Sequence, residues 1–292
     1  MSVPPPPVLR LGGRAFDDGH PVVMGIVNPT PDSFYDGGRA YRRDDALRLV
    51  EAHVAAGADV VDIGGIRAGP GPLVDADEEK RRTVGLVALV AEHLPETVVS
   101  IDTWRPEVAE AAVEAGARLI NDAWGYDPRM PEIAAAHGVG LVCTHTANAV
   151  PREYTLRFCY ADLVGEVRSE LVRRAERAAV LGVPREGILI DPSHDFAKNT
   201  WHSLELTRRL GELVDTGWPV LVSVSNKDFI GEALGLAKDQ RLEGTLATIA
   251  VCAWLGARVF RVHNVRESRR ALDMVATIRG SRPPVKTLRA LM

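Results

Sequence analysis

Cysteine is scarce in this chain, and its spacing excludes the structures that cysteine usually builds. Only three cysteines occur among 292 residues, at Cys143, Cys159 and Cys252. Their odd number and wide spacing fit neither a disulfide framework nor a metal-binding set. We therefore expect three small buried hydrophobic side chains in a protein of a reducing compartment, the cytoplasm.

Long apolar runs and an excess of one charge are also missing. No run reaches the roughly 18 uncharged residues of a membrane span, and the formal net charge is -4, which gives no basic field for nucleic acid. The start, MSVPPPPVLRLGG, lacks the charged and apolar regions of a signal peptide. Its prolines predict an extended tail over residues 1–10, and no linker divides residues 11–292, which we assign to one domain. Within its first part, the two glycines of VLRLGGRAF suggest a small hairpin at the barrel bottom.

What the chain does have is a recurring pattern of short apolar runs that each end in a polar residue. The runs are VVMGIVN28, DVVD62, VVSID102, ARLIN121, VGLVCTH145, GILID191, VLVSVSNK227 and VFRVH263. Stretches of helical period separate them, for example RPEVAEAAVEAG after Asp102 and SLELTRRLGELV after Asp191. Eight such units predict an α/β fold, a single (β/α)8 TIM barrel. The alternative is an open doubly wound sheet, which would carry a GxGxxG turn after its first strand, and none occurs there.

Polar strand ends in a barrel lie around one mouth, so we treat them as one candidate site. They are Asn28, Asp62, Asp102, Asn121, His145, Asp191, Lys227, Arg261 and His263. Carboxylates, amides and a lysine together suit a flat heterocycle with both donors and acceptors. Arg261 and His263 lie two apart on one strand and suit a phosphate group at the same mouth.

Other barrel chemistries fit these residues less well. A metal-dependent hydrolase typically places an HxH pair on an early strand, and the first strand here ends in Asn28. A Schiff-base aldolase would use Lys227 as the nucleophile, but the adjacent Asp228 favours a charged, hydrogen-bonding lysine. His194 and Asp195 form a possible acid/base pair, with an ordered loop as the simpler interpretation.

Several segments in order carry a resemblance to a known family. MGIVNPTPDSFYDGG, DIGG, SIDTWRPEVAE, INDAWG, DPSHDFAK, SNKDFIGE and RVHNV resemble the dihydropteroate synthase family over most of the chain. The resemblance implies a pterin-binding barrel that joins 6-hydroxymethyl-dihydropterin pyrophosphate to p-aminobenzoate, with Mg²⁺, in folate biosynthesis. It also suggests a homodimer.

The resemblance assigns a role to individual positions. Asp102, Asn121, Asp191 and Lys227 would hold the pterin ring, Asn28 would lie on Mg²⁺, and Arg261 with His263 would bind pyrophosphate. Phe34 and Asp36 would belong to the mobile first loop, and Phe196 would edge the p-aminobenzoate pocket. Asp102, Lys227, Arg261 and His263 are therefore the expected catalytic residues.

The chain departs from the family at the end of the site that binds the second substrate. The family's GGESTRPG is GGIRAGPG here, so Ile66, Arg67, Ala68 and Gly69 replace Glu, Ser, Thr and Arg, and Arg67 is a possible substitute for the lost arginine. The family's SRKS is SNKD, with Asn226 and Asp228 in place of Arg and Ser, and Asp228 would repel the carboxylate of p-aminobenzoate. Pro29 stiffens the first loop.

Two hypotheses follow from this combination. The chain resembles the divergent second copy found in some bacteria, a pterin-binding paralogue with weak or lost condensation and doubtful binding of p-aminobenzoate. The alternative is a working synthase in which Arg67 compensates. A pterin-binding methyltransferase domain would need a corrinoid partner module, which this chain does not carry.

Overall fold

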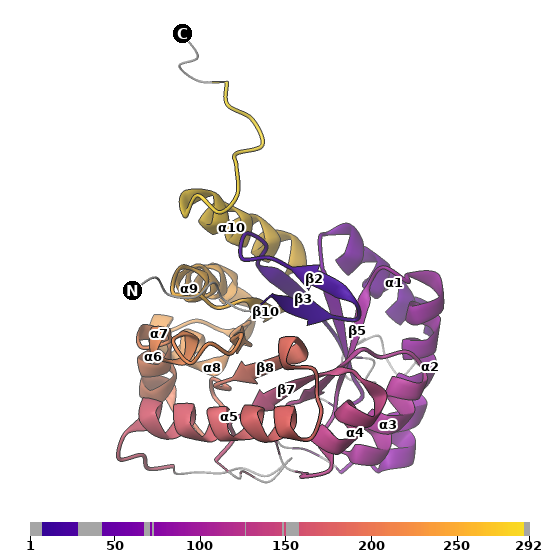
Figure 1. Ribbon diagram of the computed structural model, residues 1–292. Helices are drawn as coiled ribbons and strands as arrows, with labels where there is room; N and C mark the ends of the chain where they lie inside the picture. The colour runs from indigo at the N-terminus through magenta and orange to yellow at the C-terminus, as the bar shows by residue number, and fades with distance from the viewer. Residues whose placement is uncertain are drawn as a thin grey trace.

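Eight parallel strands form the centre of the molecule, as the sequence predicts (Figure 1). The structure is a computed structural model that describes residues 8–28, 43–66, 71, 73–125, 127–147, 149 and 158–288. The strands are β3 (Val22–Val27), β4 (Val60–Gly64), β5 (Val98–Asp102), β6 (Leu119–Asp122), β7 (Gly140–Thr144), β8 (Ile188–Asp191), β9 (Leu221–Val222) and β10 (Val259–Val262). They pair in the order β8-β7-β6-β5-β4-β3-β10-β9. Between β8 and β9, the parallel bridge of Ile190 with Val220 joins the sheet edges, and the predicted (β/α)8 barrel is confirmed.

The barrel interior has an apolar floor. The inward side chains of the lower strand positions form one buried cluster, which contains Val22, Met24, Val60, Val98, Leu119, Val142, Leu189, Leu221 and Val259. Because successive side chains alternate across a strand, the residues two positions further along point inward at the next level. Polar side chains begin at that level, so the mouth is polar and the floor is apolar.

A short antiparallel hairpin covers the bottom of the barrel. It pairs β1 (Leu9–Leu11) with β2 (Arg14–Phe16), as predicted from the glycines between them, and Gly12 and Gly13 adopt φ of 55° and 82° in the turn. Leu9, Leu11 and Phe16 are buried in the floor cluster. The expected boundary of the tail at residue 10 is therefore wrong, since Leu9 and Arg10 already belong to the hairpin.

Helices cover the outside of the sheet (Figure 1). They are α1 (Arg43–Ala55), α2 (Ala76–His93), α3 (Pro106–Glu114), α4 (Met130–His137), α5 (Leu163–Val180), α6 (Thr200–Arg208), α7 (Gly211–Val214), α8 (Asp228–Leu234), α9 (Leu242–Trp254) and α10 (Val265–Ile278), with short 3-10 turns η1 (Arg185–Gly187) and η2 (Lys238–Gln240). No helix in the described part of the chain is long and apolar enough to cross a membrane.

Three details differ from the sequence-based expectations. The stretch SLELTRRLGELV is divided into α6 and α7 rather than forming one helix. Helix α8 begins directly after Lys227, although its seven residues carry too short a pattern to predict it. Cys143 and Cys252 are buried as expected, but Cys159 is exposed because it lies in a segment before α5.

Candidate functional site

The barrel mouth is lined by polar side chains directly above the apolar floor. Strand pairing places Asp62 beside Ser100, Asp102 beside Asn121, and Thr144 beside Asp191. Each of these residues lies an even number of positions from a floor residue on its own strand, so its side chain points to the barrel interior. The structure therefore brings together the carboxylates and amide that the sequence predicted from separate strands.

Arg261 is the centre of a hydrogen-bonded cluster in this mouth. Its Nε donates to Asp62 Oδ2 at 2.6 Å, and its Nη2 donates to Asp102 Oδ2 at 2.6 Å. Asp62 also accepts from Ser100 Oγ at 2.6 Å and from Asn121 Nδ2 at 3.0 Å. Buried charges of this kind are stable only when they are paired and hydrogen-bonded. The predicted anion clamp is thus neutralised by two carboxylates of the protein in this structure.

Burial controls the charge of the carboxyl groups in the mouth. Burial raises the pKa of Asp102 to about 7, and the Arg261 guanidinium opposes this rise. Burial also raises the pKa of Asp191, against the lowering effect of its hydrogen bond from Ser193 N, which measures 2.7 Å. A buried carboxyl group that accepts from one backbone N–H retains acceptor capacity for ring N–H and amino groups of a ligand.

Lys227 and Phe196 form the wall on the β8 side of the mouth. Lys227 Nζ donates to the carbonyl of His194 at 2.8 Å and lies 4.0 Å from the centre of the Phe196 ring, a cation–π contact. Burial lowers the pKa of Lys227 to about 8, and Asp195 and Asp191 oppose this effect. At neutral pH the ammonium group is still protonated and supplies hydrogen-bond donors beside Asp191.

The loop after β8 is held by its own side chains. Asp195 accepts from Ser203 Oγ at 3.1 Å and from Phe229 N at 3.2 Å, while His194 Nε2 lies 3.2 Å from Thr207 Oγ1. Asp195 therefore joins this loop to α6 and α8. No hydrogen bond joins Asp195 to His194 among the described residues, and these contacts fit the ordered loop better than the acid/base pair.

Asn28 lies at the end of β3 close to Asp102. A Cβ atom on Gly64 would lie 2.9 Å from Asn28 Oδ1 and 3.3 Å from Asp102 Cβ, so only glycine leaves both side chains their positions. Among the described residues, no group of three or more His, Cys, Asp or Glu side chains is arranged to hold a metal. Asn28 offers a single amide oxygen, which fits an Mg²⁺ ion that takes its other oxygens from phosphates and water.

His263 lies at the rim of the mouth next to Ser225. The Ser225 hydroxyl accepts from His263 N at 3.2 Å and lies 3.0 Å from His263 Nδ1. If the hydroxyl hydrogen points to Nδ1, the imidazole proton is on Nε2, where it can be donated to an anion. Ser225 thus orients the ring.

His145 is one strand-end residue that the structure does not bring into the mouth. It points to the helix layer, where Lys198 Nζ lies 3.1 Å from its Nδ1 and Glu170 Oε2 lies 3.5 Å from its Nε2. His145 follows Cys143 by two residues on the outward side of β7, so strand alternation explains the error. Phe34, Asp36, Pro29 and residues 67–70, which include Arg67, lie outside the described residues.

Sequence reasoning missed the polar residues that support the site. Ser100 lies two positions before Asp102 on β5, so the period of two along a strand was the available signal for it. Ser225 lies in the turn between β9 and α8, where that period does not apply. Lys198 donates to the carbonyls of His145 and Phe196 at 3.2 and 2.9 Å, which joins the loop after β8 to the end of β7. The sequence offers no signal for this contact.

Asp228, predicted to oppose a second carboxylate, has a partner in the structure. Its largely exposed carboxylate accepts from Arg241 Nη1 at 2.7 Å, and the same guanidinium donates to the carbonyl of Asn226 at 3.0 Å. Ion pairing with Arg241 compensates the charge of Asp228, so the expected repulsion is weaker than the sequence alone suggests.

Comparisons with known proteins show the family to which the chain belongs. The chain matches the model of the "Pterin binding enzyme" family over residues 24–263. It is 51% identical to the "Inactive dihydropteroate synthase 2" of Mycobacterium tuberculosis, over 96% of this chain and 90% of that protein. It is 37% identical to the dihydropteroate synthase of Bacillus subtilis, over 87% of each.

A solved structure shows the same similarity in three dimensions. The dihydropteroate synthase of Xanthomonas albilineans with 4-aminobenzoic acid superimposes with a TM-score of 0.85 at 36% identity, over 94% of this chain and 98% of that one. The family match spans residues 24–263, which include every mouth residue described above. The chain belongs to the pterin-binding enzyme family, the family of the dihydropteroate synthases.

Proposed function

We propose that the barrel mouth binds a 6-substituted dihydropterin and that condensation with p-aminobenzoate is weak or absent. The observation that carries the pterin assignment is the convergence of Asp102, Asn121, Asp191 and Lys227 in one mouth. Asp191 retains acceptor capacity for the amino and ring N–H groups, and Lys227 and Asn121 supply donors to a ring carbonyl or nitrogen. The polar level lies above an apolar floor, so the ring would be held at the mouth.

The pyrophosphate end would use Arg261, His263 and Asn28, with Mg²⁺ held through the Asn28 amide oxygen. The ion would neutralise charge on the leaving pyrophosphate. Arg261 is paired with Asp62 and Asp102, so an incoming anion would have to compete with two carboxylates for its donors. Binding of the anion therefore carries the cost of separating at least one buried ion pair.

Two further observations support weak condensation. Asp228 places a negative charge at the start of α8, next to Lys227, where the second substrate would bring a carboxylate. The similar mycobacterial protein bears the name of an inactive synthase. In a working site, the neutral amine would displace pyrophosphate from the pterin methylene group, and the enzyme would have to position both substrates and exclude water.

The test combines calorimetry with a turnover assay. We expect the protein to bind a dihydropterin and the Asp191→Asn variant to lose at least about tenfold in affinity, because the amide presents a donor where the ligand also donates. The Asp45→Asn variant, altered on α1, is the matched control. Formation of dihydropteroate at a rate well above background, abolished by Asp102→Ala, would contradict the loss of condensation. Absence of pterin binding would contradict the whole assignment.

A fully active synthase is the second candidate, and one contact favours it. Arg241 compensates Asp228 and would offer its guanidinium to the carboxylate of p-aminobenzoate if Asp228 turned away. Complementation of a bacterial strain that lacks its own synthase distinguishes the two candidates, since growth without added folate requires the whole reaction.

We further propose a cytoplasmic homodimer. Val251 and Trp254 of α9 and Met274 and Ile278 of α10 are exposed apolar side chains on two helices that pack together, and an apolar surface of this kind suits a two-fold interface. In analytical ultracentrifugation, we expect the wild type to sediment at the mass of two chains. The Trp254→Glu variant should sediment at the mass of one chain. A monomeric wild type would contradict it.

A further inference from the structure

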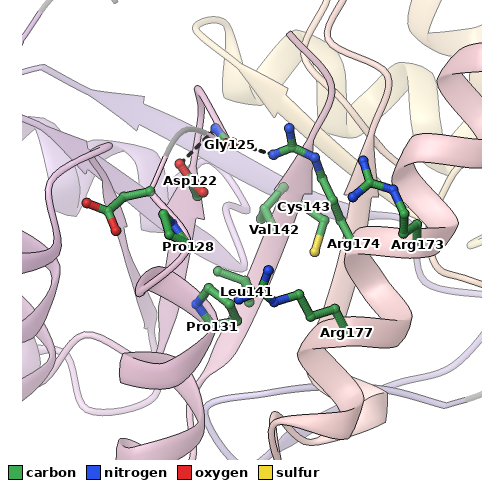
Figure 2. Close-up of a pocket in the computed structure, with 11 residues that line it drawn as sticks. Asp122, Gly125, Pro128, Pro131, Leu141, Val142, Cys143, Arg173, Arg174 and Arg177 are labelled. Carbon is green, nitrogen blue, oxygen red and sulfur yellow. Dashed lines mark hydrogen bonds between the residues drawn. The ribbon is translucent and has the colours of Figure 1, made fainter. Parts of the chain in front are cut away.

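A cavity of about 250 Å³ lies in the helix layer, away from the barrel interior. Its floor consists of outward side chains of the sheet, namely Leu141 and Cys143 of β7 and Asp122 at the end of β6. Figure 2 shows arginine side chains from α5 on one side and Pro128 and Pro131 on the other. Val142 also lines the cavity, whereas the mouth residue Asn121, which points into the barrel beside the outward Asp122, does not.

The arginines of this cavity are Arg173, Arg174 and Arg177. Arg174 is held in place, since its Nη2 lies 2.6 Å from Glu170 Oε1 and its Nη1 donates to the carbonyl of Gly125. Arg173 and Arg177 are exposed and have no acidic partner within 4 Å among the described residues. They lie four positions apart on α5, so both side chains start from one face of the helix.

The acidic groups at the cavity leave this positive charge uncompensated. Asp127 is paired with Arg129, with Nη2 and Nε at 2.7 and 3.0 Å from its carboxylate oxygens. Asp122 is buried and accepts from Gly125 N at 2.9 Å. Burial raises the pKa of Asp122 to about 7, so a large fraction of this carboxyl group is neutral at physiological pH.

We propose that this cavity binds a small organic phosphate, with the phosphate between Arg173 and Arg177 and the organic part on the apolar floor. Two guanidinium groups match the charge of a phosphate monoester and offer paired N–H donors to its oxygens. Leu141, Cys143 and the two proline rings form an apolar surface beside them, which favours an organic group over inorganic phosphate. The site is separate from the proposed pterin site and does not depend on it.

Calorimetric titration of the full chain with phenyl phosphate and with inorganic phosphate tests the proposal. We expect phenyl phosphate to bind at least about threefold more tightly than inorganic phosphate, because it also buries apolar area. The Arg173→Gln/Arg177→Gln double variant should bind phenyl phosphate at least about tenfold more weakly. Arg168→Gln, which removes an exposed arginine of α5 outside the cavity, is the matched control and should bind as the wild type does.

One further variant tests the charge at this cavity. Asp122→Asn keeps the acceptor for Gly125 N and removes the negative charge, so phenyl phosphate should bind about threefold more tightly. The barrel mouth is unaltered in the double variant, so binding that the double variant retains at the wild-type level would belong to another anion site. Equal binding by the double variant and the wild type, or no binding of phenyl phosphate, would each overturn the proposal.

Discussion

Arg261 and Asp62 are 199 residues apart in the sequence, and their side chains are joined by a 2.6 Å hydrogen bond inside the barrel. The contact links β10 to β4 across the mouth, and Asp102 on β5 extends it. This buried cluster makes the mouth polar and occupies donors of the arginine for which we propose an anion. Its consequences for stability and ligand binding can be measured separately.

The first prediction concerns the stability that Asp62 provides. In Asp62→Asn, the amide nitrogen faces the donors of Ser100, Asn121 or Arg261, and Arg261 loses one of its two charged partners. We expect the free energy of unfolding to fall by about 3 kcal/mol, measured by urea denaturation at pH 7. The control variant Asp45→Asn breaks only an exposed ion pair with Arg48. It should change the free energy of unfolding by less than about 0.5 kcal/mol. A small effect of Asp62→Asn would show that Arg261 adopts other contacts in solution.

The second prediction concerns the glycine that makes room for Asn28. In Gly64→Ala, the new methyl group would lie 2.9 Å from Asn28 Oδ1, so the amide oxygen must move. We expect Mg²⁺-dependent binding of pyrophosphate to weaken by about tenfold, measured by calorimetry with and without the ion. Gly211→Ala is the control, because a methyl group there meets nothing within 4 Å. If Mg²⁺ does not enhance pyrophosphate binding even in the wild type, Asn28 is not a ligand.

The third prediction concerns the acid sensitivity of the fold. Burial lowers the pKa of His194 to about 3 and that of His145 to about 3, below the value of about 6.5 for an unfolded chain. The unfolded state therefore binds more protons than the folded state as the pH falls below about 6.5. The free energy of unfolding then decreases by up to about 1.4 kcal/mol per pH unit for each histidine.

Substitution of one histidine tests this sign. His194 is fully buried, stacks on Phe229 and has an Nδ1 atom without a hydrogen-bond partner among the described residues. We expect His194→Leu to reduce the loss of stability between pH 7 and pH 5, measured from urea unfolding midpoints, whereas His137→Leu, exposed on α4, should not. An unchanged dependence on pH in His194→Leu would mean that the imidazole titrates normally in the folded state.

The fourth prediction concerns the subsite for a second substrate. Asp228→Ser removes a carboxylate and leaves Arg241 without its acidic partner. We expect affinity for p-aminobenzoate, measured in the presence of a dihydropterin and pyrophosphate, to rise by about threefold to tenfold. The control is Asp239→Ser, which removes the same charge at an exposed position on η2. If the affinity for p-aminobenzoate does not rise in Asp228→Ser, the obstacle to its binding lies elsewhere in the site.

The sequence by itself determined the strands, their order along the chain and the polar residues at their ends. These features depend on local patterns, namely apolar runs of strand length, stretches of helical period and the alternation of side chains along a strand. The positions of Asp102, Asn121 and Asp191 in one mouth follow from barrel closure, and the hairpin followed from its two glycines. His145 was assigned to the wrong face because its apolar run alone does not specify the register of the strand end.

Only the tertiary structure decided which charges meet. Asp62 and Asp102 surround Arg261, Arg241 compensates Asp228, and Lys198 joins His145 to the Phe196 carbonyl. Each partner comes from a different part of the chain, and the choice depends on distances and burial that no sequence spacing contains. The cavity beside Arg173 and Arg177 has the same origin, because it lies between α5, the loop before α4 and the outer face of the sheet. A local pattern specifies an element and its faces, whereas the energy of a buried charge depends on every group packed around it.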